Sequence, residues 1–190
     1  MTLFFSSLWI LVNGLADTLP LLSAACLHEA GHLLMCLMLR VPVRFFSPSP
    51  LGAVIGCDPT RLSYGAEAAV ALAGPAAGLM GTAFAALLPP CRFTALFAIS
   101  SLSLSIFNLL PAAPLDGFVF LRAVLSGLLE PGRAGRILEG VSTLAAVLLW
   151  MGAAAVQLRC GGNLSLFLLS VYMLLSLAIP LGTSAAFFSQ

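Results

Sequence analysis

The sequence predicts an all-α polytopic membrane protein with about six transmembrane helices and a small interfacial β-strand segment after the second helix. Two observations predict this class. Of the 190 residues, 61% are hydrophobic and only 8% are charged, whereas a soluble globular domain carries about 25% charged residues. The apolar residues also form long stretches with few charges inside them. This composition excludes a soluble domain, a disordered chain and a nucleic-acid-binding protein.

Six apolar stretches are long enough, or nearly so, to cross a bilayer as helices, which takes about 20 residues. The first has no basic n-region and no small-residue cleavage site, so we expect a membrane helix rather than a cleaved signal peptide. Pro20 is expected to start the second helix, and Pro111 to end the fourth. Pro89 and Pro90 are expected to stop the third. The stretches cover about residues 2–17, 20–39, 64–88, 93–110, 137–158 and 164–187.

Two segments between these stretches are not expected to span the membrane. Residues 41–63 carry four prolines with β-prone residues between them, which indicates strands and turns. Because unpaired strand edges are not tolerated in hydrocarbon, we expect this segment at the membrane interface or against protein. A short helix that carries Arg122 is expected over residues 118–130, before Pro131. The chain is therefore assigned to one transmembrane domain over residues 1–190, with its core at about 20–125.

The arginines predict the topology, because cytoplasmic loops of membrane proteins are enriched in basic residues. Six of the eight arginines lie in the loops after the second and fourth helices, and two lie on the opposite side. We therefore expect both termini and these two loops to be cytoplasmic. The larger group is Arg40, Arg44, Arg61, Arg122, Arg133 and Arg136, and the smaller group is Arg92 and Arg159.

The only two histidines, His28 and His32, lie four residues apart in an H-E-x-x-H sequence with Glu29. On a helix, residues four apart are separated by one turn and about 40° around the axis, so both imidazoles can reach one ion. Glu29 is placed to act as a general base toward water at a zinc ion. The alternative is a chance pattern of ordinary hydrogen-bonded core histidines. A buried glutamate in a membrane helix costs several kcal/mol unless it is compensated, which favours the metal site.

A hydrolytic zinc site needs a third protein ligand, and no further histidine is left to supply it. The ligand must then be a carboxylate or a cysteine, and Asp116 is the best candidate. It follows a segment in which Pro111 and Pro114 break the fourth helix, and irregular backbone at membrane depth usually lines a polar site. The predicted topology brings Asp116 and His32 to the same side of the membrane, whereas the other acids lie at helix ends or in loops.

These residues resemble the motifs of the site-2 protease family of intramembrane zinc metalloproteases, peptidase family M50. The resemblance covers about residues 20–125, and no PDZ or CBS domain is expected beside it. The chain departs from the family pattern at Gly78, where an asparagine is common, and at Phe118, where a glycine is common. The matching motifs are H-E-A-G-H at 28–32, S-P-L-G-A at 49–53, A-G-P at 73–75 and N-L-L-P-A-A-P-L-D-G at 108–117.

The resemblance implies a role for each motif residue. His28, His32 and Asp116 would bind Zn²⁺, and Glu29 would activate water. Asn108 would position the substrate or polarise its carbonyl group. The six-span layout is similar to the compact group that includes the sporulation sigma-factor processing protease. This similarity implies a bacterial plasma-membrane protein with the active site toward the cytoplasm.

The leading functional hypothesis is an intramembrane zinc metalloendopeptidase. It would hydrolyse a peptide bond in or near a transmembrane segment of a membrane-tethered protein, in regulated intramembrane proteolysis. The partners would be that membrane-anchored substrate and the lipid bilayer, with no nucleic acid. The strand-prone segment 41–57 could pair with an unwound substrate by β-addition. The alternative is a membrane metal transporter or a zinc-binding protein without protease activity. A transporter usually carries paired motifs in two halves, and the chain has one constellation and no internal repeat.

Overall fold

A computed structural model describes residues 15–41, 43–49, 52–57, 63–160 and 170–175 of the chain. The chain divides into two compact units, Met1–Leu109 and Leu110–Gln190. Each unit is described by itself below.

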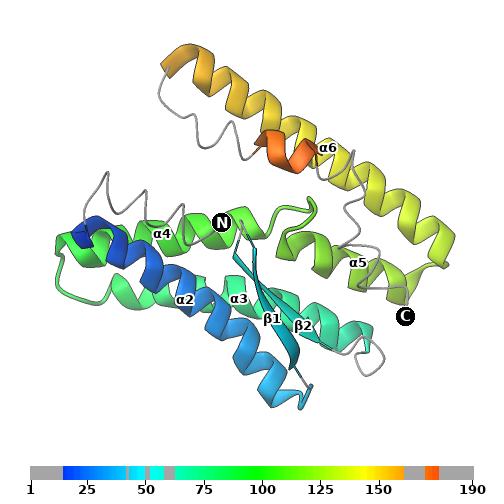
Figure 1. Cartoon of the computed structure of the whole chain (residues 1–190), viewed down its shortest axis with the longest axis horizontal. Helices are drawn as coiled ribbons and strands as arrows, with labels where there is room; N and C mark the ends of the chain where they lie inside the picture. Colours follow the sequence, from blue (N-terminus) through cyan, green and yellow to red (C-terminus); the bar gives the residue numbers. More distant parts are fainter. Residues whose placement is uncertain (1–14, 42, 50–51, 58–62, 161–169, 176–190) are drawn as a thin grey trace. The chain divides into compact units, whose positions relative to one another are not determined.

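The N-terminal unit contains three helices that all contact one another, together with a pair of strands (Figure 1). The strands are antiparallel, with Phe46 opposite Ile55 and Ser47 opposite Val54, and the second strand also contacts the first of these helices. The elements are α2 (Leu15–Met38), β1 (Val43–Ser49), β2 (Gly52–Cys57), α3 (Tyr64–Ala85) and α4 (Arg92–Asn108).

Local hydrogen bonds define where α3 and α4 begin. The Ser63 side chain accepts a hydrogen bond from the Ala66 N–H at 3.2 Å and caps α3. Cys91 caps α4, and its own N–H donates to the Thr94 hydroxyl at 2.9 Å, which completes a capping box. Hydrogen bonds from the Thr94 hydroxyl and N–H lower the pKa of the exposed Cys91 thiol. These caps place both helix starts within one residue of the predicted positions.

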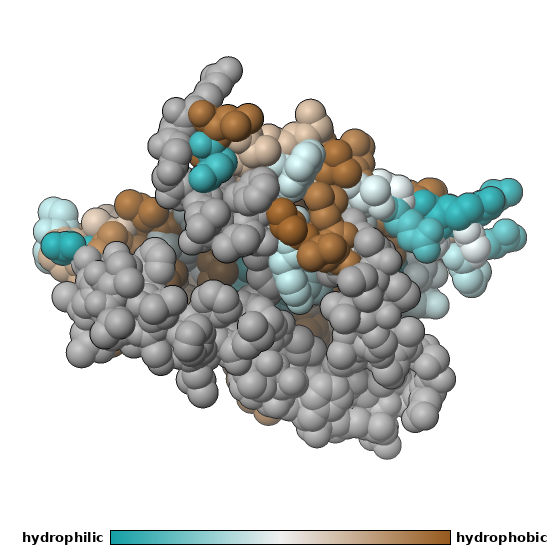
Figure 2. All heavy atoms as spheres, turned by 45° about the horizontal axis from the view of Figure 1, so that its top comes forward, coloured by the Kyte–Doolittle hydropathy of each residue, from teal (hydrophilic) through white to brown (hydrophobic). Residues whose placement is uncertain are grey.

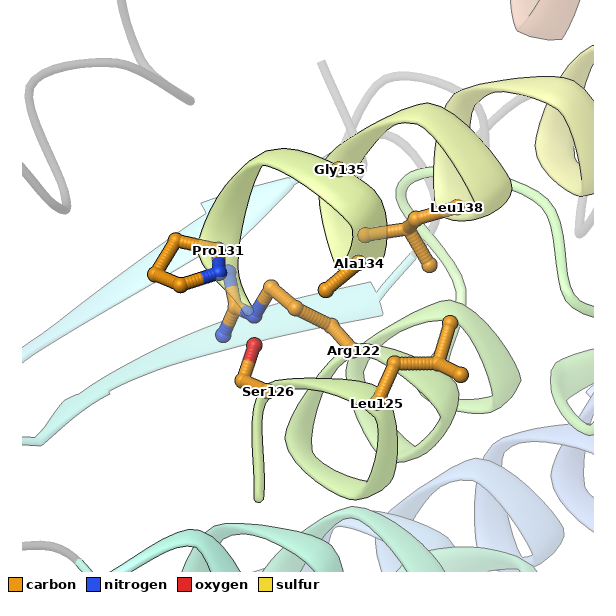
Figure 3. A pocket seen from close by; sticks show the side chains of 7 residues that line it. All are labelled: Arg122, Leu125, Ser126, Pro131, Ala134, Gly135 and Leu138. Atoms are coloured by element: carbon orange, nitrogen blue, oxygen red, sulfur yellow. The ribbon is translucent and has the colours of Figure 1, made fainter. Parts of the chain in front are cut away.

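The C-terminal unit contains α5 (Asp116–Leu128) and α6 (Pro131–Cys160), which contact each other, and residues 170–175 are helical. Pro131 begins α6, where its missing N–H has no helical partner to lose. The Ala113 N–H donates to the Ser142 hydroxyl at 3.0 Å, which ties the segment before α5 to α6. A cavity of about 210 Å³ lies between the end of α5 and the start of α6. Figure 3 shows the polar side chains of Arg122 and Ser126 in its lining.

The surface of the described residues carries many large apolar side chains (Figure 2). Among the described residues, three helices are long and apolar enough to cross a membrane, namely Thr18–Met38, Tyr64–Ala85 and Pro131–Leu158, and α4 is a shorter apolar helix. Such a surface matches lipid rather than water, so the prediction of a helical membrane protein is confirmed. Examples of the exposed side chains are Leu37, Met80, Phe84, Leu144 and Leu148.

Several predicted boundaries are wrong. Pro20 does not start a helix, because α2 already includes Leu15 and continues through Pro20. Proline keeps a helical φ angle and removes only one hydrogen bond, so a helix can pass through it. The helix expected from residue 137 begins at Pro131, because the turn that contains Arg133 and Arg136 is helical. The short helix expected over 118–130 begins at Asp116 and ends at Leu128.

The expected spans at 2–17 and 164–187 lie almost entirely outside the described residues, so the count of six spans stays a prediction. Strands β1 and β2 lie within the segment 41–63, for which strands were expected. The position of this segment at a membrane interface also stays a prediction.

Candidate metal centre

The two histidines of α2 lie side by side on one face of the helix, as their spacing of four residues requires. Their Nε2 atoms are 3.3 Å apart. The rings meet edge to face, with centroids 4.9 Å apart and planes inclined at 77°. His28 is 4% exposed and His32 is 9% exposed. The pair therefore presents two converging nitrogen atoms in a site shielded from solvent.

The separation of the two Nε2 atoms fits a tetrahedral metal ion. Zinc binds histidine nitrogen at about 2.0–2.1 Å, so two ligands at a tetrahedral angle lie about 3.3–3.4 Å apart. The observed distance of 3.3 Å is the same within its precision. The separation of the two nitrogen atoms is thus compatible with one shared ion.

A backbone carbonyl of α3 orients the second histidine. The Nδ1 atom of His32 lies 2.8 Å from the carbonyl oxygen of Val70. A carbonyl oxygen can only accept a hydrogen bond, so Nδ1 must carry the proton. In the neutral imidazole, the lone pair is then on Nε2, the atom that faces His28. Metal-binding histidines commonly have such a partner on the nitrogen that does not bind the metal.

The other predicted site residues lie on three different helices. Glu29 is half-buried next to His28 on α2. Asn108 is the last residue of α4 and is 9% exposed. Its Nδ2 donates to the carbonyl oxygen of Leu104 at 2.9 Å, which leaves the second N–H of the amide as a further donor. Asp116 is the first residue of α5 and is half-buried in the C-terminal unit. Its role as third ligand stays a prediction.

Comparison with known proteins shows which family the chain resembles. Residues 83–152, which include Asn108 and Asp116, match the model of Peptidase family M50. A protein of Synechocystis sp. (strain ATCC 27184 / PCC 6803 / Kazusa) that is named as a zinc metalloprotease is 30% identical over 125 residues, or 62% of this chain. The chain is thus similar to peptidase family M50 over these residues. It spans about a third (32%) of the length of that curated relative.

A solved structure shares the fold of this chain. The site-2 protease from Methanocaldococcus jannaschii matches with a TM-score of 0.66 and 21% sequence identity. The match covers 93% of this chain and 84% of the other. At this level of identity, the comparison establishes the fold.

The structure gives a physical reason for the departure from the site-2 protease family pattern at Gly78. A Cβ atom at this position would overlap the hydroxyl oxygen of Ser105 on α4. The Ser105 hydroxyl donates to the carbonyl oxygen of Ser101 at 2.8 Å, and Ser105 is fully buried. The space that a side chain would occupy at residue 78 is therefore filled from the neighbouring helix.

The sequence did not point to the carbonyl of Val70 as a partner of His32. A carbonyl group is common to every residue, so nothing in the residue type marks it. The Ala-Gly-Pro run at 73–75 is the one sequence motif near Val70, and it lies on the same stretch of α3. The structure shows this stretch directly against His32.

Proposed function

We propose that the protein is an intramembrane zinc metalloendopeptidase that cleaves a membrane-tethered protein in or near a transmembrane segment. The observation that carries the proposal is the His28–His32 pair, with Nε2 atoms 3.3 Å apart on a helix long and apolar enough to cross a membrane. The match of residues 83–152 to the model of Peptidase family M50 supports a protease, and the Synechocystis relative is named as a zinc metalloprotease.

The proposed metal ligands are His28, His32 and Asp116, each of which offers one imidazole nitrogen or carboxylate oxygen. Three protein ligands leave one position open, which is the arrangement of catalytic rather than structural zinc sites. When bound there, zinc would polarise the scissile carbonyl group and lower the pKa of water. Asp116 would also balance part of the charge of the ion, since both histidines bind as neutral groups.

Each remaining site residue has a role that its chemistry allows. The Glu29 carboxylate accepts a proton from the attacking water and returns it to the leaving nitrogen atom of the cleaved bond. The free N–H of the Asn108 amide donates to the carbonyl oxygen of the substrate, where negative charge develops. The burial of Asn108 strengthens this interaction, because few water molecules compete for it.

The substrate must be presented as an extended strand, because the backbone bonds of a helix are satisfied internally. We propose that the segment of β1 and β2 adds to such a strand by β-pairing. The whole of residues 1–190 would act as one metalloprotease domain in a bacterial plasma membrane, with the site and both termini toward the cytoplasm. Regulated proteolysis of membrane-anchored proteins is the corresponding cellular role.

The substitution Glu29→Gln tests the proposal, because it removes the base and keeps the shape of the side chain. Purified variant and wild type are compared for bound zinc and for cleavage of a membrane-anchored test substrate. We expect the variant to retain zinc and to lose about 10²- to 10⁴-fold in cleavage rate. Glu67→Gln, in the first turn of α3, is the matched control and should retain both properties.

Two results would contradict the proposal. Wild-type cleavage by the Glu29→Gln variant would show that Glu29 is not the base. Zinc uptake into sealed vesicles that is abolished by Asp116→Asn, without any cleavage by the wild type, would establish the alternative of a metal transporter.

A further inference from the structure

The imidazole of His32 occupies the space in which residue 74 of α3 would carry a side chain. A Cβ atom built on Gly74 would lie 2.6 Å from Cε1 and 2.7 Å from Cδ2 of His32, and closer still to Nε2. Atoms do not approach to such distances in real structures, so any other residue at position 74 would displace the ring. The backbone of α3 is therefore in direct contact with the proposed metal ligand.

The same turn of α3 also fixes the orientation of the ring. The carbonyl oxygen of Val70, one turn before Gly74, accepts the hydrogen bond from Nδ1 of His32 at 2.8 Å. The ring is thus held at Nδ1 by a hydrogen bond, and its other edge fills the space beside Gly74 where a side chain would project. These two contacts leave Nε2 directed toward Nε2 of His28.

A second glycine allows the two helices to come this close. A Cβ atom on Gly31, which precedes His32, would lie 2.5 Å from the carbonyl oxygen of Ala73 and 2.7 Å from Cβ of Ala77. The facing residues of α3 are small and Pro75 beside them is fully buried. Close approach of backbones through small residues is a general way in which membrane helices pack. Here that approach also brings a carbonyl group within hydrogen-bond distance of His32.

We propose that the turn of α3 from Val70 to Gly74 is a positioning element for the metal ligand His32. Gly74 sets the place of the imidazole ring, and the Val70 carbonyl sets the tautomer that leaves Nε2 as the metal-binding atom. This inference rests on the proposed metal centre. It assigns a role in that centre to α3, which lies outside the H-E-x-x-H motif. Gly74 and Val70 are positioning residues because they act through His32.

The substitution Gly74→Ala tests the positioning of the ring. The matched control is Gly65→Ala on the same helix, where an added Cβ atom meets no described heavy atom within 4 Å. Co²⁺ is the probe, because its visible absorption spectrum reports the geometry of its ligands. We expect Gly74→Ala to lower the affinity for Co²⁺ by about 10- to 100-fold and to change the spectrum. Gly65→Ala should leave both unchanged, and circular dichroism should show the same helix content in all three proteins.

A measurement on the metal-free wild type tests the tautomer and does not depend on any variant that could fail to fold. The chain has only two histidines, so ¹⁵N-histidine labelling gives two ring systems, and His28→Gln identifies the signals of His32. At alkaline pH, we expect His32 with the proton on Nδ1 and none on Nε2. A folded Gly74→Ala variant should lose this preference.

Either of two results would overturn the inference. One is a His32 ring in the metal-free wild type that carries its proton on Nε2. The other is a folded Gly74→Ala variant with the wild-type Co²⁺ affinity and spectrum. Failure of the proposed function would look different: the wild type would show the expected tautomer and Co²⁺ site, and yet cleave no membrane-anchored substrate.

Discussion

The buried glycines of α3 and the glycines of α6 have opposite surroundings, although both helices are long and apolar enough to cross a membrane. In α3, an added Cβ atom at Gly74, Gly78 or Gly81 would approach a heavy atom of another helix to less than 3.0 Å. In α6, an added Cβ atom would meet no described heavy atom within 4 Å at any of four glycines. These four are Gly132, Gly135, Gly140 and Gly152.

The difference shows which helix the N-terminal unit is built around. Seven residues of α3 are buried, and all are alanine, glycine or proline, so α2 and α4 can approach its backbone closely. In a membrane, helices associate through close van der Waals contact rather than through exclusion of water, which makes small residues at the contact decisive. The glycines of α6 have no such neighbour among the described residues, so their small size serves no contact there.

The largest loss of stability is expected for Gly31→Ala, on the α2 side of the contact between α2 and α3. The added Cβ atom would lie 2.5 Å from the carbonyl oxygen of Ala73, and a backbone carbonyl inside a helix cannot move aside. Overpacking of this kind typically costs about 1–3 kcal/mol. Reversible unfolding of the detergent-solubilised protein measures the loss, with Gly65→Ala as control. A loss no greater than that of the control would show that α2 and α3 can separate at low cost.

A smaller loss of stability is expected for Gly78→Ala, and a second substitution should restore part of it. The atom nearest to the added Cβ atom would be the hydroxyl oxygen of Ser105. Removal of that hydroxyl in Ser105→Ala costs about 0.5–1.5 kcal/mol, since the bond to Ser101 is lost. In the double variant, the added Cβ atom would still lie 3.3 Å from the carbonyl oxygen of Ser101, which is a tight contact, and 3.6 Å from the Cβ atom of residue 105. We therefore expect the double variant to be more stable than the sum of the single changes predicts, by about 0.5–2 kcal/mol. Additive losses in the same unfolding measurement would show that a side chain at residue 78 does not clash with the Ser105 hydroxyl.

The local part of the metal centre could be predicted from the sequence, whereas its support from α3 could not. The spacing of His28 and His32 determines their proximity on a helix, because the helical period places every fourth residue on one face. The partner of His32 lies 38 residues away and is a backbone carbonyl, which no residue type reveals. Likewise, the A-G-P motif marks Gly74 in the sequence, but nothing in that motif indicates that the His32 ring lies beside this glycine.

Helix boundaries were predictable where strong local signals exist. Ser63 and Cys91 cap α3 and α4, and the starts of these helices were predicted within one residue. Pro20 misled the prediction for α2, because a proline inside an apolar stretch does not always end a helix. The start of α6 was placed too late because its first two turns carry two arginines, which were read as a loop.

The smallest change in stability is expected for Gly140→Ala in α6. It should be a gain, whereas the other substitutions should lower stability. Gly140 is exposed inside a helix and has open space around its Cα among the described residues. Alanine is favoured over glycine in a helix interior by about 0.5–1 kcal/mol, because it restricts the unfolded chain. We therefore expect a slightly raised unfolding midpoint in detergent, and the same for Gly152→Ala. A loss of stability in both variants would show that this face of α6 is a packed contact, and the contrast with α3 would not hold.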